Sequence, residues 1–244
     1  MKFLTALTLT LPSLAASSAI NGLLDASITG GAAVATSPDR RAGSCLCNGA
    51  TAASDGADFL CGDKRLGPKQ LPTMLPLGSF VASYNRLGSD DITVDQFLAA
   101  WTGPDGRYRY PPQNGFTLDV HGDAINGTLT LEVGTLIDRF GSEYGSYVSA
   151  ASAPFSQRSL PPSSLDADPK NPDFPYGYHL YKVLRPFAVV GGPIAPWFGQ
   201  PGLGAQFYTG GLGNIMKLIE DGYIERQDPS ILVTQSQGAC TQSG

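Results

Sequence analysis

The sequence predicts an α+β protein: a twisted, largely antiparallel sheet with few short helices and a small disulfide-stapled N-terminal accessory region. After Phe116, apolar residues come in short runs, some of them alternating, as in half-buried strands. The 30 glycines and 19 prolines in 244 residues favour loops over a helical bundle. Three of the four cysteines lie close together, between residues 45 and 61, which indicates a small cross-linked unit ahead of the sheet.

The N-terminus has the pattern of a secretory signal peptide, predicted for residues 1–19. Lys2 precedes a short apolar run, and small residues follow as far as Ala19. The run is too short to cross a bilayer, so we expect a secreted or cell-surface protein. Residues 20–44, rich in Ala, Gly, Ser and Thr, predict a flexible leader. Its Arg40–Arg41 pair fits a processing site and, equally well, two solvated side chains.

The cysteines indicate disulfides formed in an oxidising compartment. A direct bridge between Cys45 and Cys47 would be strained, so we expect one of them to join Cys61 and the other to join Cys240. Zinc binding is the competing interpretation, but Cys-x-Cys is not the usual zinc spacing. Asn126 begins the glycosylation sequon Asn-Gly-Thr, which predicts an exposed turn.

Residues 45–115 are predicted to form the accessory, thumb-like region. Thr93 and Gln96 form a capping box, and Phe97 and Trp101 follow at helical spacing. One clear helix is therefore expected here. Residues 116–228 form the predicted main domain, and residues 229–244 a C-terminal tail.

The main domain is expected to contain strands over residues 128–133, 136–140 and 206–208. The nearly continuous apolar stretch 178–190 predicts one central strand that is covered on both faces. Residues 214–221 predict a short helix that ends before a glycine.

The stretch 136–162 concentrates charge and aromatic side chains between glycines and prolines. It holds two of the 16 basic residues, Arg139 and Arg158, with Asp138, Glu143 and several aromatic residues. Arginine presents a planar fork of donors that suits phosphate oxygens, and it stacks on flat rings. The stretch therefore fits either a nucleotide site or a buried Asp–Arg pair among ordinary core aromatics.

Five ordered sequence blocks carry a family resemblance. They are L-I-D-R-F-G at 136–141, R-S-L-P-P at 158–162, Y-H-x-Y at 178–181, G-G-P-I-A-P-W-F at 191–198 and Q-P-G-L-G-A-Q-F at 200–207. Together they resemble the tuberculosis necrotizing toxin family of NAD glycohydrolases, and most of all its fungal secreted branch. The resemblance runs from about residue 136 to 224.

The resemblance implies roles for individual residues. Arg139 and Gln206 would be catalytic, and the residues implied to bind substrate are Phe140, Tyr147, Arg158, His179 and Trp197. In detail, Phe140 would stack on the substrate, Arg158 would clamp phosphate, and Gln206 would orient ribose or water because an amide cannot act as a base.

Other assignments stay open at this point. His179 fits a core histidine as well as a site residue, while Trp197 and Phe198 fit a pocket wall better than core. Glu143 is the second candidate for a catalytic group, and Asp138 is expected to pair with a nearby arginine.

The predicted function is a secreted NAD(P)⁺ glycohydrolase that releases nicotinamide and ADP-ribose. The alternatives are an ADP-ribosyltransferase with a protein acceptor and a non-enzymatic surface binding protein. No cofactor or metal is expected, since only two histidines are present. A net charge of −5 without a basic block argues against nucleic acid as a partner. A homodimer is expected by analogy with the family.

Overall fold

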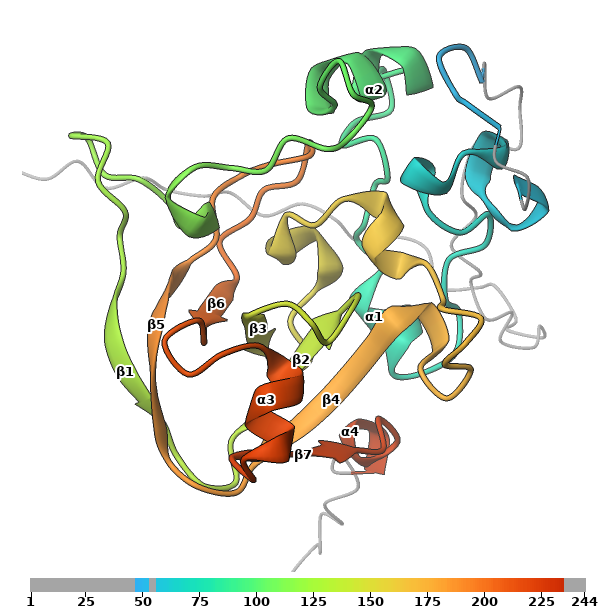
Figure 1. Cartoon of the computed structure of the whole chain (residues 1–244). Coiled ribbons are helices and arrows are strands. Elements are labelled where there is room, and N and C mark those ends of the chain that lie inside the picture. The colour runs from blue at the N-terminus through green and yellow to red at the C-terminus, as the bar shows by residue number, and fades with distance from the viewer. Residues whose placement is uncertain (1–46, 53–55, 235–244) are drawn as a thin grey trace, which may run out of the picture. The chain divides into compact units, whose positions relative to one another are not determined.

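The computed structural model describes residues 47–52 and 56–234. Within these residues, seven strands form one sheet in the order β1-β5-β6-β3-β2-β4-β7, with every neighbouring pair antiparallel (Figure 1). The strands are β1 Gly127–Leu131, β2 Leu136–Phe140, β3 Tyr147–Ala150, β4 Tyr178–Val183, β5 Phe187–Pro193, β6 Ala205–Tyr208 and β7 Ile224–Gln227. This confirms the predicted α+β class with a largely antiparallel sheet.

Helices are short throughout the described residues. The α-helices are α1 Leu77–Phe80, α2 Val94–Trp101, α3 Ile215–Glu220 and α4 Ile231–Thr234. The 3-10 helices are η1 Gly56–Asp58, η2 Leu60–Gly62, η3 Lys64–Leu66, η4 Gln113–Gly115, η5 Phe155–Arg158, η6 Pro162–Leu165 and η7 Pro175–Gly177. None of them is both long and apolar enough to span a membrane.

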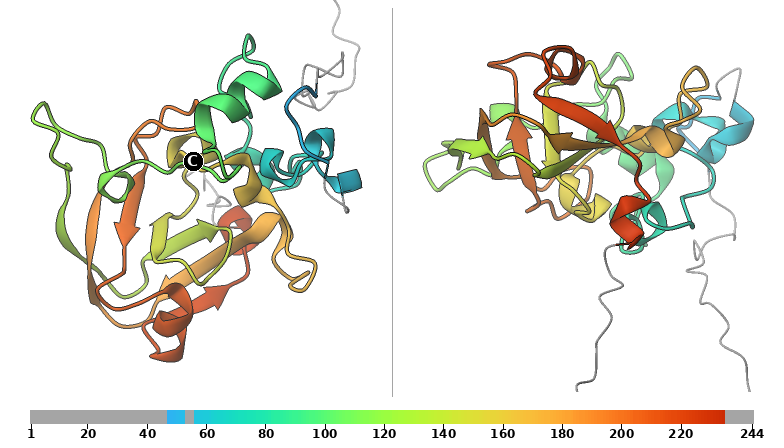
Figure 2. Two further views of the ribbon diagram at one scale, coloured as in Figure 1. Left: turned by 45° about the horizontal axis from the view of Figure 1, so that its top comes forward. Right: turned by 90° about the horizontal axis from the view of Figure 1, so that it is seen from below.

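Each side of the sheet is covered by its own hydrophobic core. On one side, Ile137 and Val148 pack with Ile215 and Leu218 of α3. On the other side, core residues of β2 and β4 pack with Phe80 of α1 and partly buried residues of α4. The right view of Figure 2 shows the sheet nearly edge-on, with α3 on one side and α1 and α4 on the other. Successive side chains of a strand point to opposite sides of the sheet, so the position of a residue along its strand determines which of the two sides it faces.

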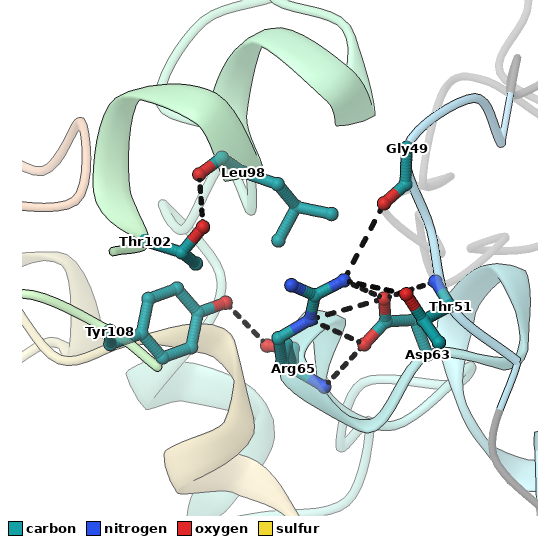
Figure 3. A network of polar contacts seen from close by, with 7 residues as sticks. All are labelled: Gly49, Thr51, Asp63, Arg65, Leu98, Thr102 and Tyr108. Carbon is teal, nitrogen blue, oxygen red and sulfur yellow. Dashed lines mark hydrogen bonds and ion pairs between the residues drawn. The ribbon is translucent and has the colours of Figure 1, made fainter. Parts of the chain in front are cut away.

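The accessory region is held by an ion pair, a disulfide and a third core cluster. Arg65 binds the buried carboxylate of Asp63, with 2.6 Å between Nη2 and Oδ2, and the Tyr108 hydroxyl donates to the Arg65 carbonyl at 2.6 Å (Figure 3). Cys47 is bonded to Cys61. This confirms one of the two predicted bridges, whereas Cys45 and Cys240 lie outside the described residues.

Several predicted elements are confirmed. β2 has the expected bounds, α2 has the expected capping box, and α3 begins after the side-chain cap of Asn214. The single strand expected over 178–190 is wrong: Leu184, Arg185 and Pro186 form a turn, and β4 and β5 are separate strands. β3 and β7 were not predicted.

Candidate active site

Gln206 and Tyr147 lie on the same side of the sheet and share one partner. In the β3–β6 register, Tyr147 faces Tyr208 and Ser149 faces Gln206, and residues directly opposite each other project to the same side. The Gln206 Nε2 donates to the main-chain carbonyl of Asn114 at 2.7 Å. The Tyr147 hydroxyl donates to the Asn114 Oδ1 at 2.9 Å. Two predicted site residues therefore meet at Asn114, a residue of η4.

The contact with Asn114 fixes which way the Gln206 amide points. A carbonyl oxygen can accept only from a donor, so the nitrogen end of the amide must face Asn114. The Oε1 accepts no hydrogen bond from the described residues. An amide oxygen in this position can accept a hydrogen bond from a hydroxyl group or a water molecule, but it cannot take up a proton near neutral pH.

Tyr147 is part of an aromatic pair beside this amide. Its ring lies 4.9 Å from the ring of Tyr208, tilted by 34°. Burial raises the pKa of Tyr147, and Tyr208 adds to the effect, so the hydroxyl stays protonated and donates its hydrogen bond. Together with Gln206 the pair forms a half-buried surface with both flat rings and polar atoms.

Arg139 lies on the opposite side of the sheet from Gln206. It is paired with His179 on β4, while its neighbour Asp138 is paired with Ser149 and so shares the side of Gln206. The Arg139 side chain curls back into the loop between β2 and β3. Its Nε donates to the Ser142 carbonyl and its Nη1 to the Tyr147 carbonyl, both at 2.6 Å.

Because residue 145 is glycine, the loop has room for the guanidinium in this position. A Cβ at Gly145 would lie 2.1 Å from the Arg139 Nη2, closer than two nonbonded atoms can approach, so the guanidinium would have to shift. Among the described residues, that Nη2 has no hydrogen-bond acceptor. Burial lowers the pKa of Arg139, while Tyr181, Glu143 and Tyr110 act in the opposite direction. An arginine stays charged under these conditions, so a cationic donor is left over for a ligand.

Glu143 ties the Arg139 loop to three other elements. Its carboxylate accepts hydrogen bonds from the Tyr181 hydroxyl at 2.8 Å and from Arg226 at 2.9 and 2.6 Å. Its main-chain carbonyl accepts from the Met216 N–H of α3 at 3.2 Å. Burial raises the pKa of Glu143, but the bonds from Arg226 and Tyr181 outweigh burial and leave it below its usual value. Glu143 is thus an ionised anchor with its donors already in place.

His179 is packed behind this anchor. It is 7% exposed, its ring lies 4.2 Å from the ring of Phe174, and its Nδ1 is 3.5 Å from the Glu143 Oε1. Burial lowers the pKa of His179, and the nearby Glu143 opposes that effect. Its surroundings are those of a core histidine, the first of its two interpretations.

Phe140 and Arg158 are both buried in the core beside the sheet. Arg158 is 4% exposed and binds Asp138 through two parallel hydrogen bonds of 2.5 and 2.8 Å. Its Nε and Nη2 also donate to the Ala153 carbonyl. Phe140 is 3% exposed and its ring lies 5.1 Å from the Arg158 guanidinium, inside the core. In this structure Arg158 thus forms a buried ion pair and Phe140 a core contact, which confirms the predicted pairing of Asp138. Their roles in substrate binding stay predictions.

Trp197 is half-buried and packs against the accessory region. Its Nε1 donates to the Arg109 carbonyl at 2.7 Å, and its ring lies 5.3 Å from the ring of Trp101. Phe198 beside it is fully buried against α2. This loop therefore attaches the accessory region to the sheet domain, with Phe198 in the core and Trp197 half-buried. A substrate-binding role of Trp197 stays a prediction.

The chain is similar to known proteins. Residues 130–227 match the sequence profile of the family described as tuberculosis necrotizing toxin. The conidial surface nicotinamide adenine dinucleotide glycohydrolase nadA of Aspergillus fumigatus is 46% identical over 187 residues, which cover 75% of this chain and 76% of that protein. The chain belongs to the tuberculosis necrotizing toxin family. The solved structure of tuberculosis necrotizing toxin with its immunity factor is 18% identical, with a TM-score of 0.43, over 72% of this chain and 98% of that one.

The part matched to the family includes Arg139, Tyr147 and Gln206, but not Asn114. Sequence reasoning missed Asn114 because its contacts reach 33 and 92 residues along the chain. The available signal was the Asn-Gly dipeptide at 114–115, which is typical of a backbone in the left-handed region.

Other features of the described residues do not add to this site. They contain no group of three or more His, Cys, Asp or Glu side chains that could hold a metal ion. A hollow of about 410 Å³ lies beside α1 and α4, and its lining residues, Leu75, Pro76, Ser79, Phe80, Ser152, Leu232 and Val233, include no titratable group. Asn126 is exposed just before β1.

Proposed function

We propose that this protein is an NAD⁺ glycohydrolase that releases nicotinamide and ADP-ribose. The observation that carries the proposal is the 46% identity, over three quarters of the chain, to a protein named as a nicotinamide adenine dinucleotide glycohydrolase. The arrangement of Gln206, Tyr147 and Arg139 supports it, because all three match the family's motif positions and present unused polar or aromatic surface.

The reaction needs positioning more than proton transfer to a leaving group. In NAD⁺ the ribose C1′ is joined to a cationic pyridinium nitrogen. When this bond breaks, its electron pair stays on nitrogen and nicotinamide leaves neutral. The water oxygen then bonds to C1′ and its proton passes to solvent. The enzyme must therefore orient ribose and water and stabilise a cation-like transition state.

The candidate site offers groups for these tasks. The Asn114 contact occupies the Gln206 Nε2 and leaves the Oε1 to accept from a ribose hydroxyl or from the attacking water. The Tyr147–Tyr208 pair offers flat surface to the nicotinamide ring. The Nη2 of Arg139 can donate a charge-assisted hydrogen bond to a phosphate oxygen.

Finer properties belong to the same proposal. We propose that NADP⁺ is also a substrate, that no metal or organic cofactor takes part, and that the first 19 residues direct secretion. Since the Aspergillus fumigatus relative is named for the conidial surface, we propose a secreted or surface location here too. Glycosylation of Asn126 and a homodimer are proposed on the sequon and on family analogy.

The decisive experiment measures nicotinamide release from NAD⁺ by the purified mature protein, with chelator and without any protein acceptor. A glycohydrolase releases nicotinamide and free ADP-ribose in equal amounts. Release only when an acceptor protein is added would establish the transferase instead, and no release would leave a binding protein.

Gln206→Ala tests the mechanism within the same assay. It should lower kcat by about 10²–10³, as loss of one preorganised hydrogen-bonding group does, with a smaller effect on KM. Gln227→Ala is the matched control, because Gln227 lies on the edge strand β7 and its side chain, within the described part of the chain, donates only to Glu225 and to its own neighbour Arg226. A Gln206→Ala enzyme with near-native kcat would remove Gln206 from the mechanism and leave Glu143 as the candidate.

A further inference from the structure

The turn that holds Asn114 has an unusual backbone. Gln113, Asn114 and Gly115 have φ values of 51°, 57° and 80°, so three consecutive residues lie in the left-handed region. A residue other than glycine seldom adopts this region, and it persists there only where the surrounding structure enforces it. Such backbones gather at functional sites.

The turn is fastened to the sheet domain directly beside Gln206. The Gly115 carbonyl accepts from the Ala195 N–H at 2.9 Å, and the Thr117 N–H donates to the Pro193 carbonyl at 2.8 Å. Phe116 between them is 1% exposed. Pro193 is paired with Ala205, the neighbour of Gln206. The turn is therefore hydrogen-bonded to β5, which pairs with the strand β6 that carries Gln206.

We propose that Asn114 is a positioning residue that holds both Gln206 and Tyr147 in their working orientations. The inference rests on the proposed glycohydrolase function and deepens it. Asn114 uses two different atoms: its main-chain oxygen fixes the Gln206 amide and its Oδ1 fixes the Tyr147 hydroxyl. Neither contact involves the substrate, so Asn114 acts through these two residues.

The choice of asparagine follows from the two tasks. Asparagine tolerates the left-handed region better than most residues, because its short polar side chain can hydrogen-bond locally. Alanine would be strained there and would lack an acceptor. Glycine suits the backbone but has no Oδ1, and aspartate keeps an acceptor oxygen at the same place. The two contacts can therefore be separated by mutation.

Asn114→Gly removes the bond to Tyr147 while it keeps the main-chain oxygen for Gln206. We expect kcat for NAD⁺ to fall about tenfold, the effect of one lost hydrogen bond, with KM changed by less than about threefold. Asn114→Asp should restore kcat to within about threefold of the wild type, since it retains an acceptor. Gln113→Gly is the control, because it relaxes the neighbouring left-handed residue and should leave kcat unchanged.

A double-mutant cycle with Tyr147→Phe shows whether the two residues act together. If Asn114 works through Tyr147, the double variant is no slower than the slower single variant. Independent, multiplying losses would overturn the proposal. So would a wild-type kcat in Asn114→Gly, or an equal loss in Asn114→Asp.

Nuclear magnetic resonance of protein with isotope-labelled tyrosine tests the Tyr147–Asn114 contact directly. The ring signals of Tyr147, assigned from their loss in Tyr147→Phe, should shift in Asn114→Gly and stay in place in Gln113→Gly. Unshifted signals refute the positioning role whatever the kinetics. A wild-type protein that releases no nicotinamide refutes the proposed function instead, so the two failures are distinguishable.

Discussion

The buried pair of Arg158 and Asp138 gives the sharpest test of the structure against the family resemblance. Both side chains are almost completely enclosed, and the Asp138 carboxylate also accepts from the Tyr178 hydroxyl at 3.0 Å and the Ser152 N–H at 3.1 Å. Arg158→Met would keep much of the stem volume and leave the Asp138 charge without its cation. Breaking such a pair costs about 3–5 kcal/mol of unfolding free energy, since the remaining charge is buried and uncompensated.

The expected shift in melting temperature follows from that free energy. In a protein of this size each kcal/mol lowers Tm by about 2–4 °C, so Arg158→Met should melt about 6–20 °C below the wild type. Circular dichroism or differential scanning fluorimetry measures this directly. Arg107→Met is the control: its ion pair with Asp105 is 3.9 Å long and exposed, and its loss should change the unfolding free energy by less than about 0.5 kcal/mol.

The same variant separates a structural role from substrate binding. At a temperature well below its Tm, Arg158→Met should release nicotinamide with a KM close to that of the wild type. A Tm within about 2 °C of the wild type, with KM raised tenfold or more, would refute the reasoning. Arg158 would then clamp phosphate after leaving the pair seen here.

Two further predictions concern the electrostatics and the covalent frame. Because hydrogen bonds hold the pKa of Glu143 below the usual value of about 4.3, its contribution to stability is complete above that pH and is lost as the pH falls through the lowered pKa. Tm measured from pH 7 to pH 3 should therefore fall less steeply in Glu143→Gln, and parallel curves would contradict this. Non-reducing peptide mapping should find Cys47 linked to Cys61 and should link Cys45 to Cys240, whereas a link from Cys61 to Cys240 would contradict the structure.

The sequence predicts elements best where the signal is local. β2 alternates between two cores and α2 carries its own capping box, so both are evident from a few neighbouring residues. β3 has no such signal, because Tyr147–Ala150 runs into a stretch of small residues and is defined by pairing with β6, some sixty residues away. The stretch 178–190 is apolar in both strands and in part of its turn, so composition could not reveal the reversal.

The candidate site shows the same limit. The resemblance selects Gln206, Tyr147 and Arg139 but says nothing of what holds them. Asn114 could be identified only in three dimensions, since its partners Tyr147 and Gln206 lie on β3 and β6, far from it in the sequence. Arg158 shows the reverse case: its motif fits two roles, and only the structure shows that it is buried in an ion pair with Asp138.

The strand register adds a constraint on how a dinucleotide can bind. Gln206 and Arg139 project to opposite sides of the sheet, so they cannot grip the same group of a ligand lying flat on one side. They are joined through residue 147: its carbonyl accepts from Arg139, while its hydroxyl shares Asn114 with Gln206. Under the proposed function, we therefore expect a dinucleotide to meet Gln206 and Arg139 through different groups, with Tyr147 between the two contacts.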